Sequence, residues 1–378
     1  MRVSTTLLVV CVMSLVALGL VMLSSASAAK PQASFYQLQF LWAGFGLLGL
    51  VLACAMDYRW LNRWAAVPWL LLAGTAAVLV LVLVIGPVRN GARRWLVIAG
   101  QSVQPSEFAK ITLVVVLAWW GHRWQKRLEK GWSNLWFGLV APGLLVGLIL
   151  VPILLEPDVG TTVLLGAVAG LMLFVAGTRL RYLCLVGLLA GAALGWFVYQ
   201  YPDRVERVLA VFSKEKYARS AAYQAEQAKV ALGAGGLKGL GLGNGRQKLG
   251  FVPEHHTDFI FSVVGEELGL LTTLLVLAGY AIVVGCGMYI AWHASDTFGM
   301  LLATGISSLI GLQAMINIGV VTGSLPTKGF ALPFLSYGGS NLVTMLICVG
   351  LLLSVAGRAS TDPRRSVQNP FALAGTPM

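Results

Sequence analysis

The sequence predicts an all-α polytopic membrane protein, with about ten transmembrane helices and one large extracytoplasmic loop between spans seven and eight. Hydrophobic residues make up 57% of the 378 residues and charged residues only 11%. A soluble domain carries roughly a quarter charged residues, so this composition indicates a membrane protein. The mean hydropathy of +0.80 agrees. The third observation is a series of apolar windows of about 20 residues, which is the length that crosses a bilayer as a helix.

The apolar windows justify ten spans, taken in chain order: 5–25, 38–56, 66–87, 106–121, 137–155, 159–176, 181–200, 259–290, 298–323 and 341–356. The first window resembles a signal peptide, because Arg2 precedes it and a run of small residues follows it. It is also long enough to span, and we expect it to be the first transmembrane helix. The eighth window is too long for a perpendicular crossing, and we expect it to tilt or to extend beyond the bilayer.

Basic residues in short loops predict that the amino terminus lies in the cytoplasm. The inner loops then hold Arg59, Arg63, Arg123, Lys126, Arg127, Lys130, Arg179 and Arg181. Ten spans put both termini on the cytoplasmic side, with 1–356 as a single transmembrane domain, 201–258 as its large outer loop and 357–378 as a cytoplasmic tail that we expect to be disordered. Only four of the 15 acidic residues fall on the inner side. Any chemistry is therefore expected at the outer face.

The net charge of +12 favours anionic partners, either lipid headgroups or a phosphorylated substrate. The five cysteines are scattered singly, so neither a disulfide framework nor a metal site is indicated. The glycine-rich stretch 233–245 lacks the Gly-Lys-Ser/Thr ending of a nucleotide loop and lies on the outer side, where ATP is absent. Its backbone, with Arg246 and Lys248, could instead approach a phosphate.

Asp258 is the first candidate for a catalytic group. It lies in the run Pro-Glu-His-His-Thr-Asp-Phe-Ile-Phe, 253–261, at the mouth of an apolar helix that also carries Glu266 and Glu267. A charge at the edge of a bilayer-spanning segment is costly, so the default interpretation is a functional site. The two adjacent histidines of this run could suggest zinc. Adjacent histidines point in different directions and no cysteine lies nearby, which disfavours a zinc site.

A second group of charges opens the fourth span. Glu107 and Lys110 lie three residues apart on one helix face inside the apolar boundary, where a neutralising pair is expected. Arg94 and Trp95 precede them in the outer loop. These residues fit a structural ion pair with interfacial anchors, and they fit a cationic outer pocket for phosphate equally well.

Glu156 and Asp158 open the sixth span. Acidic residues are favoured at a helix amino terminus, so we expect Asp158 to cap this helix. Two carboxylates at one membrane edge could also bind a divalent cation such as Mg²⁺ or Mn²⁺. The spacing favours the cap, and no cofactor is required by the sequence.

A stretch broken by proline and glycine, 323–341, lies between the last two spans and contains Lys328, Ser336 and Ser340. Irregular backbone at membrane depth must be buried in protein or line a wet cavity. A simple turn is the alternative. The density of polar side chains favours the wall of a cavity.

These blocks together resemble the SEDS family (shape, elongation, division and sporulation) over nearly the whole chain. The most specific parts are Gln-Pro-Ser-Glu at 104–107 with Lys110, Glu-Pro-Asp at 156–158, 253–269 and 326–340. Residues 241–249 and 326–329 resemble the division branch of the family more than the elongation branch. The chain departs from its relatives at 226–229, where Gln-Ser is usual, and at Asn341, where a second serine is common.

The resemblance implies a peptidoglycan glycosyltransferase that polymerises lipid II on the outer face of the cytoplasmic membrane, at the division septum. By analogy, the matched functional residues are Asp258, Lys110, Glu107 and Asp158. Asp258 would act as the general base that takes a proton from the acceptor 4-hydroxyl. Charge on the pyrophosphate leaving group would be offset by Lys110, Arg94, Arg246 and Lys328.

The resemblance also implies partners. The chain does not carry the transpeptidase motif set, in which Ser-x-x-Lys is accompanied by Ser-Asp-Asn and Lys-Thr-Gly. A class B penicillin-binding protein is therefore expected to crosslink the product, together with other division proteins and no nucleic acid. A lipid II flippase and a scaffold are the rival classes, and the same polymerase in cell elongation is the rival within the family. The charges gather at the outer face rather than at the midplane, and no inverted repeat is visible, which favours the polymerase.

Overall fold

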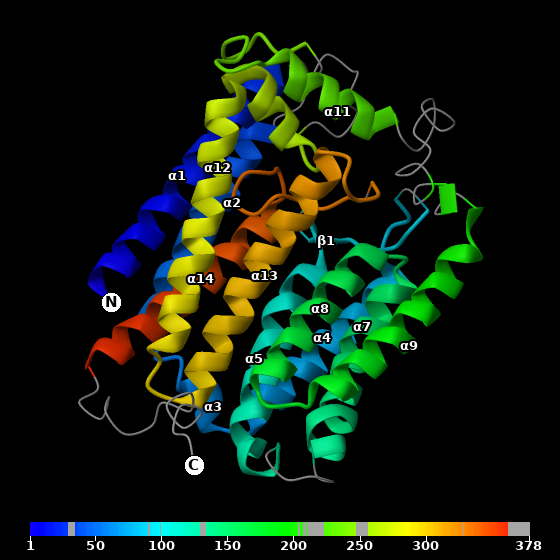
Figure 1. Ribbon diagram of the computed structural model, residues 1–378, viewed down its shortest axis with the longest axis vertical. Helices are drawn as coiled ribbons and strands as arrows, with labels where there is room; N and C mark the ends of the chain where they lie inside the picture. Colours follow the sequence, from blue (N-terminus) through cyan, green and yellow to red (C-terminus); the bar gives the residue numbers. More distant parts are fainter. Residues whose placement is uncertain are drawn as a thin grey trace.

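The computed structural model is built almost entirely of helices, as predicted (Figure 1). It describes residues 1–28, 35–89, 91–98, 100–128, 134–202, 205–206, 209, 223–246, 256–327 and 329–361. The long helices run side by side, with α11 at one end of the molecule. The beginning of α1 and the end of α14 lie near each other, away from α11.

Ten helices or helix pairs account for the ten apolar windows. They are α1 (Arg2–Ala28), α2 (Phe35–Ala55), α4 (Ala66–Ile85), α5 (Pro105–Leu128), η1 (Trp136–Val140) running into α7 (Ala141–Leu155), α8 (Val159–Val175), α9 (Leu180–Tyr199), α12 (Ile260–Trp292), α13 (Thr297–Val321) and α14 (Gly339–Thr361). The shorter elements are α3 (Trp60–Arg63), α11 (Tyr223–Ala234) and an antiparallel hairpin of β1 (Leu96–Ile98) and β2 (Gln101–Val103).

Within the described part of the chain, eight helices are long and apolar enough to cross a membrane, and α8 is apolar but shorter. The predicted fold class, an all-α polytopic membrane protein, is confirmed. The number of crossings, ten, stays a prediction. Of the predicted outer loop 201–258, the structure describes α11 and the turns up to residue 246, together with residues 201, 202, 205, 206, 209 and 256–258. Residues 357–361 of the tail that we expected to be disordered belong to the end of α14, and residues 362–378 lie outside the described residues.

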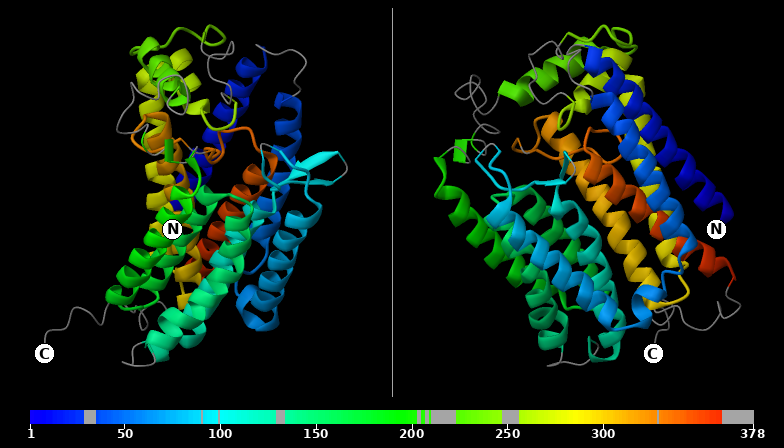
Figure 2. Two further views of the ribbon diagram at one scale, coloured as in Figure 1. Left: turned by 90° about the vertical axis from the view of Figure 1, so that its right-hand side faces the viewer. Right: turned by 180° about the vertical axis from the view of Figure 1, so that it is seen from behind.

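The helices form two groups that meet along α13 and α5. Figure 2 shows α1, α2, α12, α13 and α14 on one side and α4, α5, α7, α8 and α9 on the other. Helix α13 packs against α12 in its own group and against α5 and α8 across the junction. Most residues of the apolar part of α13 are buried inside the protein, whereas α9 has no buried residue. The centre of the molecule is therefore the α13–α5 junction.

The chain between α13 and α14 runs through the interior. We call Gly329–Gly338 the buried segment, since residues 332–336 are buried within it; Gly329, at its beginning, is exposed. Gly19 of α1 lies so close that an added Cβ would stand 2.8 Å from the backbone of Leu335. A proline- and glycine-broken stretch buried in protein is one of the two outcomes expected at membrane depth. A cavity beside it stays a prediction.

Side chains from two helices satisfy backbone groups of the buried segment. Gln39 of α2 donates from Nε2 to the Ser336 carbonyl at 3.2 Å and accepts from the Gly338 N–H at 3.1 Å. Tyr280 of α12 donates its hydroxyl to the carbonyl of Pro333. Each unsatisfied backbone group in a bilayer interior costs several kcal/mol, so these side chains stabilise a loop that could not otherwise be buried.

Helix α12 breaks at Gly269, where φ is 79° and ψ is −178°. The break divides the 33 residues of α12 into two shorter helical parts. The sequence indicated only that this helix is too long for a perpendicular crossing, and the break itself was not predicted. The Leu270 N–H donates to the Gly236 carbonyl at 2.9 Å, and the Leu240 N–H donates to the Glu266 carbonyl at 2.9 Å. The glycine-rich loop thus supplies the backbone partners that the helix loses at its break.

We predict that Gly269→Ala strongly destabilises the protein. An alanine at positive φ costs about 1–2 kcal/mol, and its Cβ would stand 2.4 Å from the backbone nitrogen of Gly239. Gly285→Ala is the matched control in the same helix, because nothing lies within 4 Å of its added Cβ. Thermal unfolding in detergent should show a lower midpoint for Gly269→Ala alone. Equal midpoints for the two variants would contradict the importance of the break.

Candidate active site

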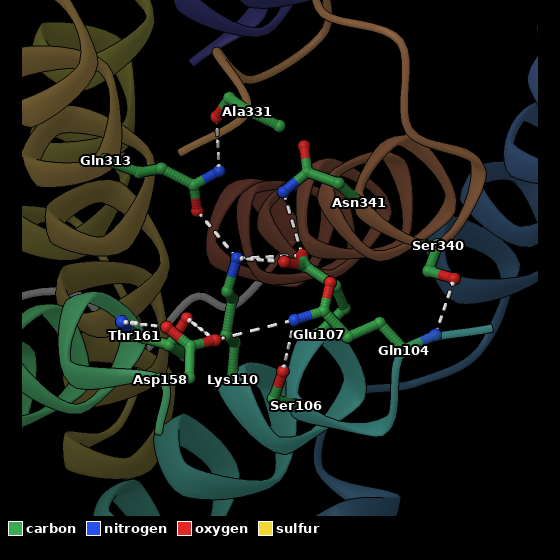
Figure 3. Close-up of polar contacts among 10 residues, drawn as sticks. All are labelled: Gln104, Ser106, Glu107, Lys110, Asp158, Thr161, Gln313, Ala331, Ser340 and Asn341. Carbon is green, nitrogen blue, oxygen red and sulfur yellow. Dashed lines mark hydrogen bonds and ion pairs between the residues drawn. The ribbon is translucent and has the colours of Figure 1, made fainter. Parts of the chain in front are cut away.

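A buried ion pair lies at the start of α5. Lys110 Nζ lies 2.8 and 2.7 Å from the two carboxylate oxygens of Glu107, and it donates to Gln313 Oε1 of α13 at 2.8 Å (Figure 3). The side chain of Lys110 is 1% exposed. Asn341 of α14 donates from Nδ2 to Glu107 Oε2 at 2.8 Å. The predicted pair is present, and the three N–H groups of the ammonium meet three oxygens.

Asp158 caps α8 as predicted. Its Oδ1 accepts from the Thr161 N–H at 3.1 Å and its Oδ2 from the Thr161 hydroxyl at 2.8 Å. Gln104, just before α5, reaches the same carboxylate with Nε2 at 3.5 Å and donates more closely to Ser106 Oγ at 2.9 Å. The Gln104 N–H donates to Ser340 Oγ, at the start of α14, at 3.1 Å. The beginnings of α5, α8 and α14 are therefore linked (Figure 3).

Arg94 holds the turn that presents Asp158. Its Nε donates to the Glu156 carbonyl at 2.8 Å, and its Nη2 donates to the Pro157 carbonyl at 2.7 Å. Trp95 follows it at the entry to β1. The guanidinium of Arg94 thus already binds protein oxygens at two of its nitrogens. Contact of Arg94 or Trp95 with a substrate stays a prediction.

Glu156 is a buried carboxyl group without a hydrogen-bond partner among the described residues. Burial, followed by the nearby charge of Asp158, raises the pKa of Glu156 to about 8, against the opposing effect of Arg94. Both oxygens of Asp158 are already used in hydrogen bonds. In the part of the chain that the structure describes, no three His, Cys, Asp or Glu side chains gather as a metal site. A divalent cation at Glu156 and Asp158 stays a prediction.

Asp258 lies in the turn before α12 and is half-buried. Its carbonyl oxygen accepts from Asn317 Nδ2 of α13 at 2.8 Å, and the same amide donates to the carbonyl of Phe330 in the buried segment. A Cβ added to Gly329 would stand 2.8 Å from Asp258 Oδ2. The buried segment therefore passes directly beside the Asp258 carboxylate, and a side chain at position 329 would require that carboxylate to shift.

Ser336 ties the buried segment to the turn before Asp258. Its hydroxyl donates to the Thr257 carbonyl and accepts from the Leu332 N–H at 2.7 Å. The Tyr337 N–H donates to the His256 carbonyl at 2.9 Å. Ser336, like Ser340, is a predicted substrate contact whose hydroxyl is used here to hold backbone. Substrate contact by either serine stays a prediction.

The glycine-rich loop binds carboxylates of the chain itself. The N–H groups of Gly243 and Gly245 donate to Glu267 at 3.0 and 3.3 Å, and the Arg246 N–H donates to Glu266 at 2.8 Å. Ser25 of α1 donates to Glu267 at 2.7 Å. These three amides hold the two buried acids, and the approach of this loop to a phosphate stays a prediction. The Arg246 residue is exposed, while Lys248 and Lys328 lie outside the described residues.

We call the polar side chains described above at Gln104, Lys110, Asp158, Asp258 and Ser340 the cluster. Four helices begin around it: α5, α8, α12 and α14. Gln104 links the first, second and fourth, and the His256–Tyr337 bond brings in α12. A helix amino terminus carries a partial positive charge, and several of them aimed at one place favour an anion. The cluster combines this potential with two half-buried carboxylates, Asp158, which caps α8, and Asp258.

Comparison with known proteins identifies the family. Residues 5–361 match the family described as "cell cycle protein", FtsW/RodA/SpoVE. The chain belongs to this family. It is 40% identical over 362 residues to "Probable peptidoglycan glycosyltransferase FtsW" of Trichlorobacter lovleyi, covering 94% of both chains. It is 38% identical to "Stage V sporulation protein E" of Bacillus subtilis, covering 93% of this chain and 96% of the relative.

Solved structures agree with the family assignment. One chain of a complex described as "structural coordination of polymerization and crosslinking by a peptidoglycan synthase complex" has a TM-score of 0.76 at 30% identity, over 94% of this chain and 98% of that one. The rod shape determining protein RodA of Thermus thermophilus has a TM-score of 0.69 at 30% identity, over 94% and 97%. The resemblance inferred from the sequence motifs is confirmed.

Four amide side chains in this family member were not among the predicted site residues. Gln104, Gln313, Asn317 and Asn341 join the charged groups to one another and to the backbone. A polar side chain in an apolar helix is a signal in itself, because it is costly there unless it is paired. That signal was available for Gln313 and Asn317, the two amide side chains of α13, whose other buried polar side chains are hydroxyls.

We predict that the stability of the protein depends on pH through Glu156. At a pH between the ordinary pKa of a glutamate and about 8, Glu156 keeps its proton in the folded state but has lost it in the unfolded chain. The free energy of unfolding therefore falls as the pH rises through that window. Glu156→Gln removes the dependence. The thermal unfolding midpoint of Glu156→Gln minus that of wild type should become larger as the pH is raised from about 5 to about 8. Gly285→Ala, which changes no titratable group, is the control. A difference that does not vary with pH would contradict the raised pKa.

Proposed function

We propose that this chain is a peptidoglycan glycosyltransferase that polymerises lipid II, the disaccharide peptide carried on undecaprenyl pyrophosphate, into glycan strands at the outer face of the inner membrane. Curated relatives that align over more than nine-tenths of the chain carry the name peptidoglycan glycosyltransferase. The observation that carries the proposal is the position of Asp258, a half-buried carboxylate where four helix amino termini meet.

Asp258 is proposed as the general base. It accepts the proton of the acceptor 4-hydroxyl as that oxygen attacks the anomeric carbon of the donor; the bond from that carbon to the pyrophosphate oxygen breaks, and undecaprenyl pyrophosphate leaves. A base must lie within hydrogen-bond reach of the proton it takes. Gly329 supports this role, because the absence of a side chain there keeps the buried segment close without covering the carboxylate with a Cβ.

The leaving group is a pyrophosphate, and the electrostatics of the cluster suit an anion. Four helix amino termini contribute partial positive charges, and the chain carries a net charge of +12. Arg94, Arg246 and Lys328 are the proposed cations for this charge. Lys110 differs from them, because its ammonium is buried and already meets three protein oxygens.

The proposed partner is a class B penicillin-binding protein that crosslinks the strands. The complex to which the chain is similar is described by the words polymerization and crosslinking. We further propose a role in division at the septum, with both termini in the cytoplasm. Several relatives are named FtsW, and the beginning of α1 and the end of α14 lie toward the same end of the molecule. A flippase is disfavoured, since the ionisable cluster lies at helix ends rather than at the midplane.

We predict that Asp258→Asn abolishes polymerisation, with a loss of at least about 100-fold, because the amide cannot take the proton. Purified protein with its transpeptidase partner, crosslinking blocked, would be given lipid II, and the glycan strands would be resolved on a gel. Glu226→Gln is the control, since it removes one carboxylate from the outer helix α11, where Glu226 pairs with Lys229.

Two results would contradict the proposal. Polymer from Asp258→Asn at the rate of wild type would remove Asp258 from the chemistry. No polymer from wild type, in a preparation that moves lipid II across vesicles, would establish the flippase instead.

A further inference from the structure

Two amide side chains on one face of α13 each join two parts of the site. Gln313 and Asn317 are one helical turn apart, and both are buried. Gln313 accepts from Lys110 at 2.8 Å and donates to the Ala331 carbonyl at 2.8 Å. Asn317 donates to the carbonyls of Asp258 and of Phe330, the residue before Ala331. Helix α13 thus lies between the ion pair on α5 and the turn that carries Asp258.

The orientation of both amides is fixed by their neighbours. Asn317 faces two carbonyl oxygens, which only accept, so its NH₂ group must point toward them. Gln313 faces an ammonium on one side and a carbonyl on the other, so its oxygen must point to Lys110 and its NH₂ to Ala331. A neutral amide bridges a cation and a carbonyl without adding a charge to the interior.

Lys110 is in no position to bind a substrate directly. Its side chain is 1% exposed, and its three N–H groups meet both oxygens of Glu107 and the oxygen of Gln313. Breaking any of these contacts would leave a buried charge short of a partner, which is strongly unfavourable. Hydrogen bonds connect the ion pair to the turn that carries Asp258 through Gln313, the buried segment and Asn317.

We propose that Gln313 and Asn317 are positioning residues, which set the place of the Asp258 carboxylate for proton transfer, and that Lys110 acts through Gln313 rather than by touching the pyrophosphate. This inference rests on the proposed function. Misplacement of a reacting group by about 1 Å can cost about 100-fold in rate. Loss of either amide should therefore lower kcat, while the affinity for lipid II, which depends on other groups, is retained.

The test compares Asn317→Leu and Gln313→Leu with two controls on the same helix. Whereas the leucine variants remove buried amides, Thr304→Val and Ser308→Ala remove buried hydroxyl groups of α13 that bond to carbonyls of their own helix. Each protein would be purified with its transpeptidase partner, and initial rates of lipid II polymerisation would give kcat, KM and the pH dependence of kcat/KM. Asn317→Ser, which keeps one donor, is the conservative variant.

We expect kcat to fall about 10- to 100-fold in both leucine variants, with KM within about threefold of wild type. The acidic side of the pH profile of kcat/KM reports the pKa of the general base, and this side of the profile should be displaced along the pH axis in Asn317→Leu. Asn317→Ser should lie between wild type and Asn317→Leu. The two hydroxyl controls should stay within about threefold in kcat. Unfolding midpoints in detergent would be measured for every variant.

The inference is overturned if the leucine variants keep the kcat of the controls, or if their loss appears in KM while the acidic side of the pH profile is unchanged. If Asn317→Leu does not fold, the same comparison is made with Asn317→Ser, using its kcat and the acidic side of its pH profile of kcat/KM. Asp258→Asn and wild type are run in parallel. A wild type that makes no polymer contradicts the proposed function, whereas an active wild type with unaffected amide variants contradicts only the positioning role.

Discussion

The structure depends on one constraint: a loop is buried inside a helical bundle, and its backbone groups must find partners without water. The buried segment meets this constraint with side chains from α2, α12 and α13, namely Gln39, Tyr280, Gln313 and Asn317. The same hydrogen bonds that make burial possible bring the segment beside Asp258. The hydrogen bonds that satisfy the backbone therefore also place the carboxylate, and this explains why polar residues gather at these ends of the helices.

The buried ion pair is better understood as a device for position than as a source of stability. Taking two charges out of water costs several kcal/mol per ion, which their attraction only offsets when the geometry is good and further hydrogen bonds are made. Glu107 and Lys110 meet both conditions, because Asn341 and Gln313 complete their hydrogen bonds. These four side chains come from α5, α13 and α14, so the pair fixes the junction between the two groups of helices.

Local patterns in the sequence predicted the features that local physics controls. Apolar windows gave the long helices, the spacing of three gave the Glu107–Lys110 pair, and the preference for an acid at a helix start gave the Asp158 cap. The amides of the glycine-rich loop could not be assigned, because the carboxylates they bind lie about 20 residues further along. Gln313 was missed for the same reason: its partners, Lys110 and Ala331, lie far away or in an irregular segment.

The most direct test of this account is a structure of the Asp258→Asn protein with lipid II bound, solved in a lipid environment. The account predicts that the pyrophosphate lies where α5, α8, α12 and α14 begin, with residue 258 within hydrogen-bond distance of the reacting sugar. It also predicts that Lys110 keeps its contacts with Glu107 and Gln313. A pyrophosphate bound away from these helix starts, or a Lys110 ammonium that has left its partners to bind it, would contradict the account.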